Sequence, residues 1–221
     1  MSEHIIEVAI RSPKASRSEE EFHTRMDRTV AALLQVDGVG PERAFQASVT
    51  DPATDRTPAV GMTRYASLAH QKKATRNIGV LRNFVGFLRV MDLHVNVFLR
   101  PDSPDFDLAT FAREPGVALE FAACKPAAGV SDADFLAARG RYLASLDTHD
   151  EVLRSHTFTT AGGFKAKDSL VHIIEYRDRS AVDALADRRR DAMTDSDFQR
   201  MHVPSLITFA SAPTGQGDDR A

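Results

Sequence analysis

The stretch EVAIRSPKASRSEEEF (7–22) decides the fold, because its pattern returns 113 residues later as EFAACKPAAGVSDADF (120–135). Ten identical pairs lie between positions 5 and 45 at this offset, where ordinary composition gives roughly three. Beyond position 57 the match resumes at an offset of 111, and the slip falls between two turn-rich segments, where insertions are tolerated. The pattern predicts an internal duplication.

The duplication predicts how the chain is organised. We expect one repeat over 1–100 and a second over 117–212, joined by a proline-containing linker at 101–116. The last residues, 213–221, are rich in Gly and Asp and predict a disordered tail.

Each repeat carries the same series of secondary-structure patterns. Alternating apolar runs predict strands, apolar residues at helical spacing predict helices, and Ser18 with Glu21 forms a capping box. The resulting order is β-α-β-β-α-β, the ferredoxin-like split βαβ unit. In the first repeat the predicted strands are 5–11, 43–49, 59–65 and 93–99, and the helices are 18–37 and 68–91. In the second repeat the strands are 118–124, 155–161, 170–176 and 205–211, and the helices are 131–148 and one that ends near 199.

The predicted fold class is therefore α+β, with two tandem ferredoxin-like repeats packed sheet to sheet, because each sheet has one face without helices to cover it. On topology and repeat length, residues 4–212 resemble the dimeric α+β barrel superfamily, which includes the antibiotic biosynthesis monooxygenase, stress-responsive barrel and EthD-like families. The resemblance implies a barrel lined by His, Tyr or Asn that handles a phenolic or polyketide-like molecule. Haem-degrading members also use a Trp, and this chain has none. We expect no cofactor.

Strand alternation assigns side chains to the two faces of each sheet. Ile6, Val8 and Ile10 are expected under the helices, which leaves Glu7 and its counterpart Glu120 for the barrel interior. The same logic gives the barrel a set of candidate residues. The catalytic candidates are His172, Tyr176, His94 and Glu120, and the binding candidates are Glu7, Tyr65, Asn96, His156, Phe98 and Phe209. Salt bridges and hydrogen-bonded core positions are the structural alternatives for these residues.

Composition excludes several classes of function. A net charge of −3 gives no general attraction for nucleic acid or anionic lipid, and no apolar stretch is long enough to be a membrane span. The single Cys124 suits a reducing compartment, and with no visible signal peptide we expect a cytoplasmic location. No zinc motif, phosphate loop or serine-hydrolase elbow is present, so no metal site is expected.

The segment 77–91 is apolar on nearly every side, whereas the matching segment of the second repeat is polar. A helix of this kind must be buried on more than one side, so we expect a homodimer formed through it. A hydrophobic entrance for the ligand is the alternative.

Three functions remain open. The first is a cofactor-independent monooxygenase or cyclase acting on an aromatic or polyketide-like substrate through His, Tyr and Glu. The second is a barrel that binds a small apolar or aromatic ligand without turnover. The third is a structural module whose function is association. Fold by itself does not choose among them.

Overall fold

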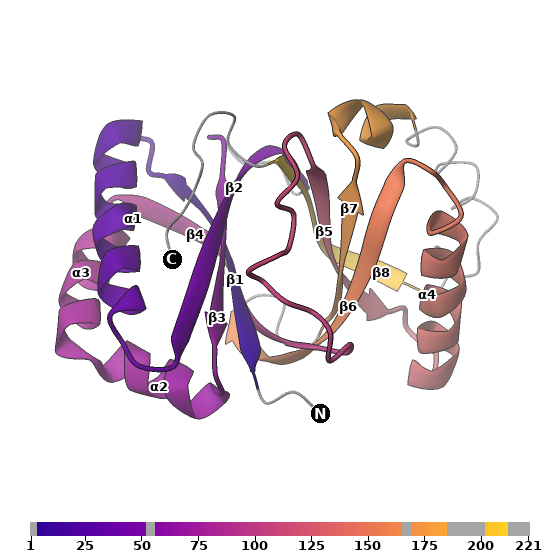
Figure 1. Ribbon diagram of the computed structural model, residues 1–221, viewed down its shortest axis with the longest axis horizontal. Coiled ribbons are helices and arrows are strands. Elements are labelled where there is room, and N and C mark those ends of the chain that lie inside the picture. The colour runs from indigo at the N-terminus through magenta and orange to yellow at the C-terminus, as the bar shows by residue number, and fades with distance from the viewer. Residues whose placement is uncertain (1–3, 52–55, 165–168, 185–201, 212–221) are drawn as a thin grey trace.

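The computed structural model describes residues 4–51, 56–164, 169–184 and 202–211, in which eight antiparallel strands close into one barrel (Figure 1). The protein is thus a mixed α+β fold. The strands are β1 (Ile5–Pro13), β2 (Val39–Asp51), β3 (Ala59–Tyr65), β4 (Met91–Pro101), β5 (Ala118–Pro126), β6 (Val152–Phe164), β7 (Leu170–Tyr176) and β8 (His202–Ser211). The helices with described bounds are α1 (Glu19–Leu34), α2 (Leu68–Arg76), α3 (Ile78–Leu88) and α4 (Asp132–Leu146).

The order of strands around the barrel is β1-β3-β2-β8-β5-β7-β6-β4, and β4 pairs with β1 to close it. Within the first half the order is β4-β1-β3-β2, and within the second half it is β8-β5-β7-β6. The register also corresponds, since Glu7 lies opposite Thr63 and Glu120 lies opposite Ile174. Positions in the two halves can therefore be compared pair by pair.

Helices cover the outside of the barrel at both ends of its long axis. Figure 1 shows α1, α2 and α3 over the outer face of the first half, and α4 on the far side of the second half. A further helix begins at 179–184, and the remainder of the helix expected to end near 199 lies outside the described residues, as does the expected tail at 213–221. Within the described part of the chain, no helix is both long and apolar enough to cross a membrane.

Local sequence sets the helix boundaries. Ser18 Oγ accepts a hydrogen bond from the Glu21 amide at 3.1 Å and starts α1, as its capping box predicts. The continuous helix expected over 68–91 is wrong, because it breaks at Asn77 into α2 and α3. The Asn77 backbone is extended, and its side chain accepts from the Gly79 and Val80 amides, so it caps a new helix.

The facing expected for the strands is also wrong. Ile6, Val8 and Ile10 point into the barrel, where they meet apolar side chains of the second half such as Phe121 and Ile173. Glu7, Tyr65 and their counterparts lie on the outer face, under the helices. A small closed barrel is filled by side chains and sealed from water, so it takes the fully apolar face of each strand. The layer between sheet and helices is open at its edges and tolerates carboxylates.

The segment between β4 and β5 packs into the barrel core. Phe106 and Phe111 belong to the same buried cluster as the inward residues of both halves. Ala112 has a φ of 49° and is held on both sides: its amide donates to Glu175 at 3.1 Å, and its carbonyl accepts from Arg43 at 2.9 Å. The expected linker is therefore part of the core.

Candidate functional site

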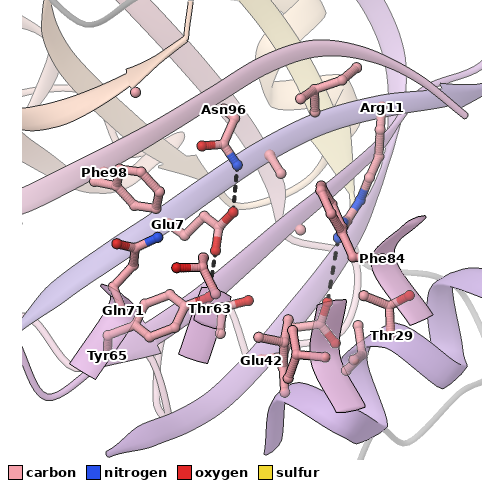
Figure 2. A pocket seen from close by; sticks show the side chains of 18 of the residues that line it. Glu7, Arg11, Thr29, Glu42, Thr63, Tyr65, Gln71, Phe84, Asn96 and Phe98 are labelled. Carbon is pink, nitrogen blue, oxygen red and sulfur yellow. Dashed lines mark hydrogen bonds and ion pairs between the residues drawn. The ribbon is translucent and has the colours of Figure 1, made fainter. Parts of the chain in front are cut away.

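A cavity of about 490 Å³ lies between the outer face of the first half of the sheet and α1, α2 and α3 (Figure 2). Its volume falls in the range of small-molecule sites, and most of its lining is apolar. The lining consists of Glu7, Ala9 and Arg11 from β1, Glu42 from β2, Gly61, Thr63 and Tyr65 from β3, Leu93, Asn96 and Phe98 from β4, Gly163 and Phe164 from β6, and Thr29, Val30, Leu33, Gln71, Thr75, Val80, Leu81 and Phe84 from the helices.

One end of the cavity holds a hydrogen-bonded carboxylate. The Tyr65 hydroxyl donates to Glu7 Oε2 at 2.6 Å, and Asn96 Nδ2 donates to Glu7 Oε1 at 2.5 Å. Figure 2 shows these three side chains converging from three neighbouring strands. Burial, together with the Glu7 charge, raises the pKa of Tyr65 well above its ordinary value. The phenol therefore stays protonated and serves as a fixed donor to Glu7.

The opposite end of the cavity holds an ion pair. Arg11 Nη2 lies 3.7 Å from Glu42 Oε1, and both side chains are largely buried. The Arg11 guanidinium also lies 5.4 Å from the centre of the Phe87 ring. Gly61 makes room for it, because a Cβ at that position would come within 2.3 Å of Arg11 Nη2. Arg11, Glu42 and Gly61 were not among the residues expected from the sequence.

The described positions of the second half that match the cavity lining carry larger or more apolar side chains. Relative to the first half, Thr29, Gly61, Thr63 and Gln71 are replaced by larger or apolar residues: Tyr142, His172, Ile174 and Val182. All four replacements are buried, and the rings of Tyr142 and His172 are 6.3 Å apart. Cys124 stands at the position of Arg11, and burial, with a further contribution from the Glu120 charge, raises the pKa of its thiol to about 12. Tyr142, His172 and Ile174 are each larger than their first-half counterparts, so they take up more of this layer.

The structure places the expected binding residues in three groups. Glu7, Tyr65, Asn96 and Phe98 come together at the cavity. His156 lies instead at the end of the barrel, where its Nε2 is 2.6 Å from Glu175 Oε1 and its ring packs on Phe106. Phe209 is on β8 opposite Glu120, and its side chain lies outside the described residues.

The expected catalytic residues lie away from this cavity. The Tyr176 hydroxyl donates to Glu120 Oε2 at 2.7 Å, and this pair reproduces Tyr65 and Glu7 in the second half. His172 is 2 % exposed. The pairing of β1 and β4 is irregular between Ile10 and Arg11, so that one residue of β4 is skipped. Because of this shift Leu93 lines the cavity and His94 does not. His94 Nε2 lies 2.8 Å from Ser12 Oγ.

Haem, which some members of the superfamily handle, does not fit the lining of this cavity. Haem iron needs an axial ligand such as His, Cys, Met or Tyr. The lining contains no His, Cys or Met, and its one Tyr, Tyr65, donates its hydroxyl to Glu7. Among the described residues, no group of three or more His, Cys, Asp or Glu is placed to hold a metal ion.

Comparison with known proteins finds similarity in structure only. No family model matches the chain, and no curated protein matches it. A chlorite dismutase candidate aligns with a TM-score of 0.67 at 9 % identity, covering 96 % of this chain and 96 % of its own. A monooxygenase candidate from Fusobacterium nucleatum subsp. nucleatum gives a TM-score of 0.63 at 11 % identity, covering 96 % and 94 %. The chain shares their α+β barrel fold.

A third structure, an anthrone oxidase-like protein, aligns with a TM-score of 0.62 at 10 % identity and covers 96 % of this chain and 92 % of its own. Identities this low establish the fold alone. The chemistry must be argued from the cavity of this chain.

Proposed function

We propose that this chain is a cofactor-independent monooxygenase whose substrate is an aromatic or polyketide-like molecule bound in the first-half cavity. The observation that carries the proposal is the Glu7 carboxylate, which lies at a mostly apolar cavity and is fixed by Tyr65 and Asn96. A carboxylate held in place beside a ligand site is a suitable general base. Two proteins with the same fold, a monooxygenase candidate and an anthrone oxidase-like protein, are in keeping with this chemistry.

Glu7 begins the reaction by taking a proton from a CH₂ group that is conjugated to a carbonyl. The electron pair of the broken C–H bond stays on the substrate as an enolate. The enolate passes one electron to O₂, and the resulting radical and superoxide combine to form a peroxide, which receives the proton back from Glu7. Glu7 then accepts the second C–H proton while the O–O bond breaks. The released hydroxide takes that proton, so CH₂ and O₂ become C=O and H₂O.

The test uses protein freed of metal and 1,8-dihydroxyanthrone as the probe, with O₂ uptake and quinone absorbance as the measurements. Glu7→Gln keeps the shape and both hydrogen-bonding neighbours but removes the base, so we expect the rate to fall about 10²- to 10⁴-fold. Glu120→Gln is the matched control, because Glu120 holds the same position in the second half, is 2 % exposed and does not line this cavity. An unchanged rate in Glu7→Gln contradicts the proposal. Binding without turnover in the unmodified protein favours the ligand-binding function instead, and neither binding nor turnover favours the association module.

We further propose that the two halves are tandem ferredoxin-like repeats, 1–100 and 117–212, with 101–116 as the connection. The equal strand order and register in both halves support this duplication. It predicts that each half, expressed alone, dimerises to rebuild an eight-stranded barrel. A first half that stays monomeric and unfolded would argue against it.

We also propose that two copies of the chain associate through α3. Four of its apolar side chains form one exposed stripe: Ile78 is 82 % exposed, Leu81 50 %, Val85 44 % and Leu88 40 %. Leu81 also lines the cavity, so a partner on this stripe would cover the cavity mouth. Light scattering should give twice the 24.3 kDa chain mass, and Leu88→Glu should give the single-chain mass. Leu136→Glu, at a 51 % exposed site on α4, is the control. A Leu88→Glu protein that remains dimeric leaves the stripe as a ligand entrance.

A further inference from the structure

Arg11 has hydrogen-bonding capacity that the protein itself does not use. Its Nε is buried and has no hydrogen-bond partner among the described residues. Its contact with Glu42, at 3.7 Å, is an ion pair too long to be a hydrogen bond. The guanidinium therefore lines the cavity without a hydrogen bond to any described residue, and its Nη groups, unlike the enclosed Nε, are the donors that a ligand oxygen can reach. Arg11 lines the cavity at the end opposite the Glu7 cluster (Figure 2).

Gly61 sets where the guanidinium lies along the sheet. Because a Cβ on Gly61 would meet Arg11 Nη2 at 2.3 Å, the guanidinium lies directly over this residue. Gly61 pairs with Ala9, and Thr63 pairs with Glu7, so the guanidinium lies two residues along β3 from the level of the carboxylate. Two strand residues span about 7 Å. A planar ring system that lies along the strands would therefore reach both groups.

The charges of the lining indicate what kind of oxygen suits Arg11. The cavity is lined by two carboxylates, Glu7 and Glu42, and by one guanidinium, so its formal charge is negative. A carboxylate ligand at Arg11 would have to displace or oppose Glu42. A neutral carbonyl oxygen accepts from the guanidinium without that repulsion. When a proton leaves such a ligand for Glu7, the charge removed from Glu7 develops on the ligand oxygen beside Arg11.

We propose that Arg11, seated over Gly61, binds the carbonyl oxygen of a neutral fused-ring ketone and stabilises it as an enolate. The substrate class is thus a neutral aromatic ketone whose acidic C–H faces Glu7, in preference to an aromatic carboxylate. The inference rests on the proposed proton transfer to Glu7. Its test is therefore a binding measurement that needs no turnover.

The experiment compares the affinities of three bicyclic probes by titration calorimetry: α-tetralone, tetralin, which lacks the oxygen, and 1-naphthoate, which carries a charge. In the unmodified protein, α-tetralone should bind about tenfold or more tightly than either of the others, the effect of one hydrogen bond to a charged donor. Arg11→Met should abolish the difference between α-tetralone and tetralin. Gly61→Ala should do the same while keeping the charge, because the new methyl group displaces the guanidinium and not the backbone.

Gly140→Ala is the control for the glycine substitution, since a Cβ there meets nothing within 4 Å, and it should retain the ketone preference. Thermal unfolding of each variant confirms folding. Equal binding of ketone and hydrocarbon overturns the inference, as does tightest binding of 1-naphthoate, failure of all three probes to bind, or a ketone preference that survives Arg11→Met. A ketone preference that depends on Arg11 in a protein with no oxygenase activity supports the inference and contradicts only the proposed function.

Discussion

Removing the hydroxyl from each of the two matched tyrosines should affect stability unequally. Tyr176→Phe takes a donor from Glu120, which is 2 % exposed. Hydrogen bonds to charged groups contribute about 1.5–3 kcal/mol, and a buried carboxylate that loses one cannot recover it from water. Tyr65→Phe takes the same donor from Glu7, which is half-buried, keeps the bond from Asn96 and faces a cavity that water can enter. We expect a loss of about 2–3 kcal/mol for Tyr176→Phe and about 1 kcal/mol for Tyr65→Phe.

Urea denaturation followed by circular dichroism measures both free energies of unfolding, and scanning calorimetry gives a second reading. For a chain of this length each kcal/mol shifts Tm by about 2–4 °C, so the variants should differ by several degrees. Both changes remove one oxygen from a fully buried ring at a corresponding position, so differences in packing largely cancel. A Tyr65→Phe loss as large as that of Tyr176→Phe would refute the reasoning, because it would mean that the first-half layer is as closed as the second.

Three further outcomes follow from the same structure. Thr63→Ile places in the cavity the residue type found at the matching position, Ile174, and so reduces the free volume. It should weaken α-tetralone binding at least about tenfold and change the free energy of unfolding by no more than about 1 kcal/mol. Burial raises the pKa of Cys124 to about 12, so iodoacetamide should leave the folded protein unlabelled at pH 8 and label it fully in urea. Because the folded-state pKa of Tyr65 is raised above its ordinary 10.0, the unfolded chain releases this proton first, and stability should fall as pH rises beyond about 10, less steeply in Tyr65→Phe when followed by urea titration.

Much of the architecture could be predicted from the sequence because strands and helices leave periodic patterns. The strands at 59–65 and 170–176 have the predicted bounds, and Ser18 caps α1 as expected. The break at Asn77 was missed because its apolar flanks continue one helical pattern across it. Asparagine followed by glycine at position 79 was the available signal, since Asn is a strong N-cap residue.

The facing of the strands could not be read from alternation alone. Alternation separates Ile6 and Val8 from Glu7 without saying which side is the more enclosed. The cost of burying a charge decides the facing. The interior of a closed eight-stranded barrel excludes water completely, whereas the layer between the sheet and its helices is open at its edges. By this rule Glu7 and Tyr65 are expected under the helices, and the candidate site is expected there too.

A difference between the two repeats indicates function only when one considers which repeat has the smaller side chain at the matching position. Gly61 and His172 occupy corresponding positions, and the sequence favours the histidine as the functional residue because its side chain is the more reactive. A ligand site, however, requires empty volume, and volume is created where a repeat has lost bulk. Gly61, Thr63 and Thr29 line the cavity together with Glu7 and Arg11, while His172, Ile174 and Tyr142 are buried at the matching positions of the other half. The half with fewer reactive side chains therefore retains the space in which the shared Glu–Tyr pair can meet a substrate, and the Glu7→Gln and Glu120→Gln comparison tests this assignment directly.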